Sequence, residues 1–279
     1  MTLSYPARPG SIRRFFSDMR EGLRRQGNVV FALIFRDLKS RSGQDGYGLL
    51  SLAGIVLEPA MGVVALSAFW YLMKREEIQG VHVVLFLTVS MTGFSMFRRA
   101  IASVPKTIRG TRAFYAFPNV KPFDAVLARF VIELVLTVLG GAILLFLAWW
   151  FLDLAIYMDY FLEGMGVFAM LIAAAFGVSL FVGVYGTRFP MAFKGIQFMS
   201  RGLLFISAVM HPANELPAEA QDFLAWNPLV HYMEAMRGFF LGMDTFPALS
   251  FTYMTGFAAV SVFMGFISYY ANRHKVIER

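Results

Sequence analysis

The sequence contains no cysteine, and only 15% of its 279 residues are charged. The absence of cysteine excludes a disulfide framework and a thiolate metal site. Soluble domains usually contain about 25% charged residues, whereas 58% of this chain is hydrophobic and its mean hydropathy is +0.60. A soluble protein of this length could not bury so much apolar surface. The composition therefore predicts a protein that crosses a membrane several times.

Sequence motifs for nucleotide binding and for hydrolysis are also absent. No stretch matches the Walker A pattern GxxxxGK[ST], so the chain itself is not expected to bind ATP in the usual phosphate cradle. The GxSxG and HExxH patterns are missing as well. The four histidines are scattered, with none at helical i,i+3 or i,i+4 spacing, so a metal site is not expected. A membrane enzyme with an unrecognised carboxylate site is an alternative left open.

Six apolar segments are predicted to be transmembrane helices. They comprise residues 49–73, 81–97, 126–152, 165–186, 193–210 and 251–271. The predicted fold is therefore all-α and integral to the membrane, with a transmembrane domain over residues 49–271. In the fourth segment Ala173, Gly177 and Gly183 form a small-residue face that favours close helix contact. Residues 211–241 are semi-apolar and rich in proline and aromatics, so we expect a re-entrant pair of short helices there.

The N-terminal segment, residues 1–48, is basic and amphipathic. Between residues 11 and 40 the apolar side chains follow 3.6-residue spacing, and the arginines lie largely off that stripe. We predict one or two helices that lie in the plane of the lipid head groups. An ordinary amphipathic helix packed on a partner protein is the alternative. No cleavable signal is expected, because no apolar region with a cleavage site follows the basic start.

The Lys and Arg residues are distributed unevenly between the two sets of loops. Twenty of the 25 fall on one set of flanks, which includes both termini and residues 98–124. The other set has three, Lys74, Arg75 and Arg237. Because cytoplasmic loops carry the excess of positive charge, both termini, including the tail 272–279, are predicted to be cytosolic. Residues 211–241 then face outward.

Residues 98–124 form a basic loop between the second and third predicted spans. It contains six Lys or Arg residues and a single acid, Asp124. Pro105 suits the first turn of a short helix that begins near Ser103 or Val104, and Pro118 ends that helix. We predict a short cytosolic helix at the membrane surface that docks on a partner through apolar side chains. These side chains are Ile108, Phe114, Tyr115 and Phe117.

Ionisable residues within the predicted spans mark structural or functional positions. Arg129 and Glu133 are one helical turn apart and are expected to form an ion pair. Arg201 lies two turns into its span, where it either snorkels to the interface or contacts an anionic substrate group. Glu58 near the middle of the first span either pairs within the protein or lies on the substrate path.

Aromatic residues make up 16% of the chain, including 30 Phe. Most are expected to face lipid or to pack in the core. A subset on inward faces could stack on sugar rings, because the C–H face of a pyranose matches an aromatic plane. A belt of Trp and Tyr at the membrane interface is equally expected. The substrate-path candidates of this type are Trp70, Tyr71, Trp149, Trp150, Phe205, Trp226 and Tyr232.

Three stretches, taken in their order and spacing, resemble the permease subunits of type-2 ABC exporters. Residues 35–60 resemble the family's entry into the first span, with Arg-Asp-Leu-Lys and Glu-Pro elements, and residues 114–129 resemble its exit from the coupling loop. Residues 227–237, NPLVHYMEAMR, preceded by 207–217, are similar to its outer re-entrant segment. The resemblance is to the polysaccharide branch, which exports capsule and O-antigen. One departure is that the family often has an aromatic where this chain has Ser51 or Leu52.

The resemblance implies a set of partners. The permease would be a homodimer in the bacterial inner membrane, with a cytosolic ABC ATPase dimer docked on the loop after the second span. ATP and magnesium would be bound by that ATPase, so no cofactor is expected in this chain and no nucleic acid as partner. The substrate would be a lipid-linked capsular polysaccharide that passes between the two copies, and a periplasmic co-polymerase or export protein would continue the route. The expected contacts to the ATPase are Lys106, Arg109, Arg112, Phe114 and Tyr115.

The expected mechanism is mechanical: closure of the ATPase dimer pushes the helix 106–117 and shifts the adjoining spans as rigid bodies. The basic N-terminus would gather the anionic lipid end of the substrate. Two other functions stay open at this point. One is an ABC permease for another glycan, such as O-antigen or teichoic acid, or for a small lipid or drug. The other is a membrane enzyme or assembly factor without transport.

Overall fold

The computed structural model describes residues 12–43, 48–111, 121–156, 158 and 160–278. Within these ranges nearly all of the chain is helical. In order, the elements are α1 (Ile12–Gly43), α2 (Gly48–Leu72), β1 (Glu77–Ile78), β2 (Val81–His82), α3 (Val83–Gly110), α4 (Pro122–Leu152), α5 (Phe161–Arg188), α6 (Pro190–Ile206), the 3-10 helix η2 (Ala213–Glu215), α7 (Ala218–Leu224), α8 (Pro228–Leu241) and α9 (Phe251–Glu278).

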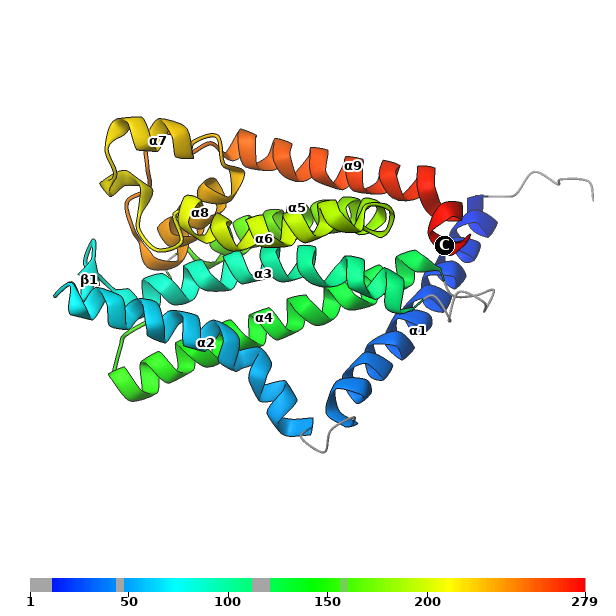
Figure 1. Ribbon diagram of the computed structural model, residues 1–279, viewed down its shortest axis with the longest axis horizontal. Helices are drawn as coiled ribbons and strands as arrows, with labels where there is room; N and C mark the ends of the chain where they lie inside the picture. Colours follow the sequence, from blue (N-terminus) through cyan, green and yellow to red (C-terminus); the bar gives the residue numbers. More distant parts are fainter. Residues whose placement is uncertain (1–11, 44–47, 112–120, 157, 159, 279) are drawn as a thin grey trace, which may run out of the picture.

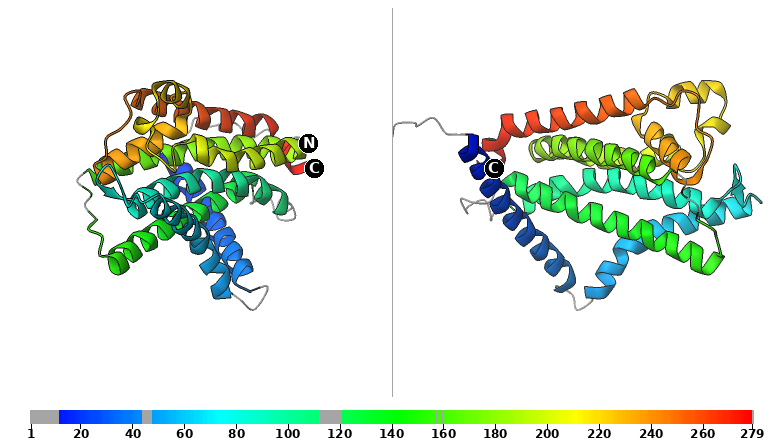
Figure 2. Two further views of the ribbon diagram at one scale, coloured as in Figure 1. Left: turned by 60° about the vertical axis from the view of Figure 1, so that its left-hand side comes forward. Right: turned by 180° about the vertical axis from the view of Figure 1, so that it is seen from behind.

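The long helices α3, α4, α5 and α9 run along the long axis of the molecule (Figures 1 and 2). The β1–β2 hairpin, η2, α7 and α8 gather at one end, which we call the hairpin end. α1, the last turns of α3 and the start of α4 lie at the opposite end, which we call the basic end. α3 lies in the middle of the bundle and packs against both α4 and α5.

Each of the six predicted spans lies mainly in one helix, and four of these helices are long and apolar enough to cross a membrane. The four stretches are Val83–Ile108, Pro122–Leu152, Phe161–Gly186 and Phe251–Asn272. Of the remaining two helices, α2 shows a shorter apolar stretch, Ala60–Leu72, over the residues described, and α6 has 17 residues. The short antiparallel hairpin is a small departure from the predicted all-α fold.

The basic loop does not begin with a separate helix. α3 continues without a break through Pro105 to Gly110, so a helix that starts near Ser103 or Val104 is wrong. Pro105 removes one backbone hydrogen bond, but the residues on either side of it are fixed by packing. Val104 and Ile108 are buried in one apolar cluster with Val126, Leu180 and Val184. Burial of this face therefore keeps the helix continuous.

α1 is one helix that passes through Gly27. Its Leu33 is buried against Ala125 and Ala128 of α4. Phe31 and Phe35, elsewhere on the helix, are 64% and 63% exposed. α1 is thus held at the basic end by one apolar face while other apolar side chains stay uncovered by the chain.

The small-residue face predicted for the fourth span contacts two helices: Gly177 lies against α9, and Gly183 lies against Val104 and Ile108 of α3. A Cβ atom on Gly177 of α5 would lie 2.3 Å from the backbone carbon of Ser261 in α9. A Cβ atom on Gly265 would lie 2.6 Å from the carbonyl oxygen of Gly177. The backbones of α5 and α9 therefore approach so closely that no side chain fits between them.

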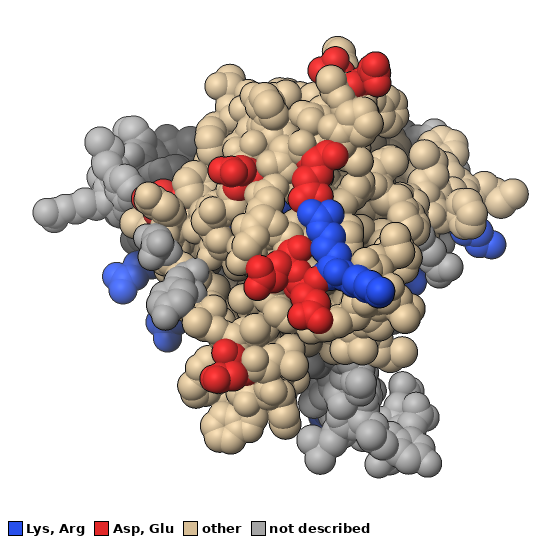
Figure 3. Space-filling view, turned by 90° about the vertical axis from the view of Figure 1, so that its left-hand side faces the viewer, with Lys and Arg blue, Asp and Glu red and all other residues tan. Residues whose placement is uncertain are grey.

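A polar network fastens the hairpin to the rest of the hairpin end. The turn residue Gln79 donates from Nε2 to Oδ1 of Asn214 at 2.8 Å and accepts the amide of Asp244 at 3.0 Å. Arg75 pairs with Glu215 at 2.6 Å. Acidic side chains surround one basic stripe on this face (Figure 3). The exposed acids at this end include Glu76, Glu77, Glu215, Glu219, Asp222 and Asp244.

Candidate functional site

The predicted contact with an ATPase lies at the basic end, and the structure describes part of it. Lys106 is exposed near the end of α3. Arg109 lies on the last turn of the same helix, but its side chain is outside the described part of the chain. Arg112, Phe114 and Tyr115 also lie outside the described residues. Of the five predicted contacts, Lys106 is therefore the one whose side chain is placed.

Asp124 caps the start of α4 and ties α1 to it. Its Oδ2 accepts the backbone amide of Lys121 at 2.9 Å. Its Oδ1 accepts the side-chain amide of Gln26, from α1, at 3.1 Å. A carboxylate in the first turn is also favoured by the helix dipole. The single acid of the basic segment thus fixes where α4 begins.

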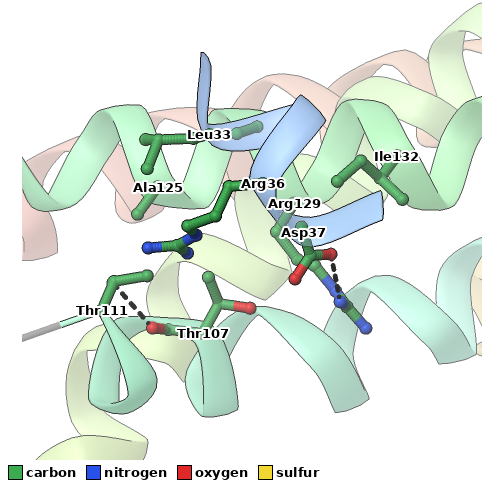
Figure 4. Close-up of a pocket in the computed structure, with 9 residues that line it drawn as sticks. Leu33, Arg36, Asp37, Thr107, Thr111, Ala125, Arg129 and Ile132 are labelled. Carbon is green, nitrogen blue, oxygen red and sulfur yellow. Dashed lines mark hydrogen bonds and ion pairs between the residues drawn. The ribbon is translucent and has the colours of Figure 1, made fainter. Parts of the chain in front are cut away.

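Arg129 joins α1 and α4 through two carboxylates. The predicted pair with Glu133 is confirmed, with an N···O distance of 2.7 Å. The same guanidinium also pairs with Asp37 of α1 at 2.9 Å (Figure 4). Its Nε is buried and has no hydrogen-bond partner among the described residues. Arg129 therefore acts as a clamp between the two helices.

A recess of about 220 Å³ lies beside this clamp, where α1, α3 and α4 meet. Figure 4 shows the side chain of Arg36 extending from α1 toward Thr107 and Thr111 of α3. The lining is completed by Leu33, Asp37, Ala125, Ala128, Arg129 and Ile132. The lining includes two arginines and one carboxylate, and the recess lies at a joint between three helices.

The substrate-path aromatics do not gather into one site within the chain. Trp149 and Trp150 are exposed at the end of α4, which Figures 1 and 2 show well away from α7. Trp226, which follows α7, is 84% exposed. Phe205 on α6 is 62% exposed. A passage lined by all of these aromatics would therefore be bounded by more than one helix.

Three further candidates lie in helices, Trp70 and Tyr71 in α2 and Tyr232 in α8. The indole Nε1 of Trp70 donates to the carbonyl of Met210 at 3.2 Å, and Arg75 lies over its ring at 5.3 Å. The hydroxyl of Tyr71 is 3.2 Å from Nε2 of His82. Tyr232 is fully buried, and its hydroxyl donates to the carbonyl of Met254 at 2.7 Å.

Two substrate-path candidates are described only by their backbone. Glu58 lies in α2 and Arg201 in α6, and both side chains are outside the described part of the structure. Their assignment as structural or functional stays a prediction.

α8 contains a buried ion pair that the sequence does not predict. By its position in the sequence Arg237 is a charge of the outer flanks, but its side chain is only 1% exposed and pairs with Glu234. One Nη donates to the carbonyl of Ala208 at 2.6 Å and approaches Oγ of Ser90 at 3.3 Å. The guanidinium also lies over the ring of Phe86, 4.6 Å from its centroid. The signal available in the sequence was the i,i+3 spacing of opposite charges on an apolar helix.

His231 is a second buried polar residue of α8. Its Nδ1 accepts the amide of Ser250 at 3.1 Å, so Nε2 carries the proton and donates to the carbonyl of Ala225 at 2.9 Å. Burial lowers the pKa of His231 below its ordinary value of 6.5, although its hydrogen bond to Ala225 and the charge of Glu234 oppose the shift. The neutral ring therefore joins α8 to the segments on both sides of it.

No group of three or more His, Asp or Glu side chains that could hold a metal ion occurs in the described ranges. The features that the described residues show are helix joints and two chemically different ends.

A family profile and several known proteins that resemble this chain all indicate the same family. A sequence profile described as "ABC-2 type transporter" matches residues 28–241. The chain is similar to the polysialic acid transport protein KpsM of Escherichia coli, with 28% identity covering 90% of this chain and 95% of that protein. It is similar to the capsule polysaccharide export inner-membrane protein BexB of Haemophilus influenzae, with 25% identity covering 86% and 89% of the two chains. For the corresponding protein CtrC of Neisseria meningitidis serogroup B the identity is 22%, covering 80% and 83%. This chain belongs to the ABC-2 type transporter family.

Proposed function

We propose that this chain is the permease subunit of an ATP-driven ABC exporter that moves a lipid-linked capsular polysaccharide across the bacterial inner membrane. The observation that carries the proposal is the breadth of the similarity: relatives named for polysialic acid transport or capsule polysaccharide export match over 80–90% of this chain. Four helices of sufficient length and hydropathy support a location in the membrane.

ATP hydrolysis is assigned to a separate ATPase bound at the basic end. The family profile and the lack of a Walker A pattern support this division of labour. The continuous α3 supports a direct mechanical link, because a push near Lys106 acts on a single helix that reaches the hairpin. The contact itself involves Lys106, Arg109, Arg112, Phe114 and Tyr115.

A second copy of the chain completes the passage. The substrate-path aromatics are spread over several helices rather than enclosing a site in one chain, which supports a channel between two copies. A periplasmic co-polymerase or export protein continues the route from the hairpin end. The proposed orientation has six spans, with both termini in the cytosol.

The test is transport by purified components. The chain is reconstituted with its ATPase in proteoliposomes, and ATP-dependent movement of labelled lipid-linked capsular polysaccharide is measured. Parallel assays with lipid-linked O-antigen, a teichoic acid and a fluorescent short-chain lipid separate the alternatives. Transport of the capsular substrate supports the proposal, whereas transport of the small lipid alone contradicts it.

A matched pair of variants tests the site of ATPase contact. Lys106→Glu reverses an exposed charge at the basic end, and Lys74→Glu does the same at the hairpin end. We expect Lys106→Glu to lower polysaccharide-stimulated ATP hydrolysis and Lys74→Glu to leave it unchanged. Equal ATPase activity in the two variants would remove Lys106 from the contact without affecting the assignment of the substrate.

A further inference from the structure

The ion pair of Glu234 and Arg237 connects parts of the chain that are far apart in sequence. The guanidinium of Arg237 donates hydrogen bonds to Glu234 of its own helix, to the carbonyl of Ala208 in the segment after α6, and to the hydroxyl of Ser90 in α3. Glu234 in turn accepts the amide of Ala213 at 2.8 Å. One pair of side chains therefore holds α8, α3 and both ends of the segment 208–213.

We call the junction of α3, α8 and the segment 208–213 the α3–α8 joint. The cost of burying its two charges indicates that this joint is rigid. A charge removed from water is stable only when its partners satisfy it in a fixed geometry. Any relative shift of α3 and α8 would separate Arg237 from Ser90 and from the ring of Phe86, and water would have to replace them. Ala208 adds a second constraint, because its φ of 52° is unfavourable for a residue with a side chain. Its carbonyl is held in that conformation by Arg237.

The joint lies near the start of α3, and the proposed ATPase contact lies near the end of the same helix. Phe86 and Ser90 lie near the start of α3, and Lys106 lies near its end. Lys106 lies 16 positions after Ser90, which corresponds to about 24 Å of helix at 1.5 Å per residue. A displacement at the basic end is thus delivered to the hairpin end along one element.

We propose that Glu234 and Arg237 are positioning residues that make α3, α8 and the segment 208–213 one rigid unit, so that a push at the basic end moves the short helices of the hairpin end. The inference rests on the proposed export function for its driving force. It goes further by naming the side chains that join the driven helix to the far end of the molecule.

A cross-link across the joint tests rigidity. A Cβ atom on Gly93 of α3 would lie 3.1 Å from the sulfur of Met236 in α8, so Gly93→Cys with Met236→Cys places two thiols across the contact. The chain has no other cysteine. We expect the oxidised double variant, bound to its ATPase, to export polysaccharide at the rate of the same protein after reduction.

The outcome is read against the reduced sample and the two single variants. Loss of export on oxidation, restored by reduction, shows that α3 and α8 must move relative to each other and overturns the proposal. Absence of export from the reduced and unmodified proteins contradicts the proposed function instead. In that case the rigid joint is tested by the spacing of spin labels at Lys106 and Asp244, which should not change between nucleotide-free and ATP-bound complexes. A change in that spacing within one chain overturns the joint.

A neutral variant tests the role of the pair in coupling. Replacing one partner alone would leave a buried charge and could prevent folding. Glu234→Gln with Arg237→Met removes both charges at similar volume and keeps an acceptor for the amide of Ala213. We expect this variant to fold and to hydrolyse ATP, but to export roughly tenfold less polysaccharide per ATP, within the usual 5- to 150-fold range of coupling between sites.

The control variant removes one acid and one base from exposed positions at the hairpin end. Glu219→Gln with Lys74→Met eliminates two charges whose side chains are exposed and that lie outside α3, α8 and the segment 208–213. Its export per ATP should match that of the unmodified protein. An unchanged ratio in the Glu234→Gln, Arg237→Met variant would show that the pair serves folding alone and would overturn the proposal.

Discussion

Arg129 illustrates how much of the basic end depends on a single side chain. Replacing Arg129 with Met removes the guanidinium that pairs with both Asp37 and Glu133, and Glu133 is only 7% exposed. We expect a loss of about 3 kcal/mol in the free energy of unfolding, as for other broken buried pairs. The measurement is thermal unfolding in detergent, and the exposed Arg24→Met on α1 is the control.

A conservative variant sharpens the same prediction. Arg129→Lys keeps the charge but lacks the planar fork that reaches two carboxylates at once. Its stability should therefore fall between those of the unmodified protein and Arg129→Met. A Lys variant as stable as the unmodified protein would show that charge, rather than bidentate geometry, holds α1 on α4.

His231 predicts a dependence of stability on pH. The folded state favours the neutral ring, because Nδ1 accepts the amide of Ser250 and burial lowers the pKa. In the unfolded chain the ring protonates near its ordinary pKa of 6.5. The stabilisation is therefore complete above pH 6.5 and decreases as the pH falls from 6.5 toward the lower pKa of the folded state.

The measurement is the midpoint of thermal unfolding between pH 8 and pH 5, conditions that bracket the ordinary pKa of His. His231→Asn retains an acceptor near Nδ1 and cannot protonate, so its curve should be flatter on the acid side. Burial also lowers the pKa of His211, and His211→Gln measures that second contribution. If His231→Asn follows the unmodified protein at every pH, the hydrogen bond to Ser250 is not what the acid disrupts.

Ion-pair partners could be predicted from the sequence where both residues lie on the same helical turn, and could not be predicted where the partners are far apart in the chain. The pair of Arg129 and Glu133 follows from i,i+4 spacing, but its second partner Asp37 is 92 residues away and has no sequence signal. Arg237 was misassigned for the same reason. Its burial depends on Ser90 and Ala208, which only the folded chain brings to it.

At the scale of elements, the contact between α5 and α9 depends on the absence of a side chain at Gly177. Any Cβ there would lie 2.3 Å from the backbone of Ser261, and backbone cannot yield as a flexible side chain does. We expect Gly177→Val to force the helices apart and to cost about 3 kcal/mol, the upper part of the overpacking range. Gly166→Val on the same helix is the control, because no atom lies within 4 Å of its Cβ.

Both glycine variants are compared by thermal unfolding and by the yield of monodisperse protein in detergent. Gly166→Val should resemble the unmodified protein, which separates steric overlap from the general effect of a β-branched residue in a helix. Equal destabilisation by the two substitutions would contradict the close contact at Gly177.

Element boundaries were predictable where apolar length decides them. All six apolar segments lie mainly in helices, although residues 81–82 form β2 and residues 207–210 lie beyond the end of α6. α4 begins at Pro122, four residues before the predicted span, where proline suits the first helical position. The extent of α3 was not predictable by the same reasoning. Pro105 indicates a helix start by local rules, but Val104 and Ile108 pack against α4 and α5, and this tertiary burial outweighs the missing hydrogen bond.

At the scale of the whole molecule, the two ends differ in charge. Exposed bases at the basic end include Arg20, Arg24, Arg25, Lys39, Lys106 and Lys121. With Arg237 buried in an ion pair, the outer flanks retain only Lys74 and Arg75 of the chain's 25 basic residues, and the bias is stronger than the sequence count indicated. By the positive-inside rule we expect the basic end to lie in the cytosol.

The absence of cysteine allows this orientation to be measured one site at a time. Single cysteines replace exposed residues at each end: Lys106 and Lys121 at the basic end, Glu219 and Asp244 at the hairpin end. With an outer-membrane-permeabilised cell and an impermeant maleimide, we expect labelling at 219 and 244 and none at 106 and 121 until the inner membrane is disrupted. Labelling at 106 in intact cells would place the ATPase contact on the wrong side of the membrane and would exclude α3 as the driven helix. Labelling at neither 219 nor 244 would instead mean that the hairpin end is covered, because both side chains are exposed in the single chain.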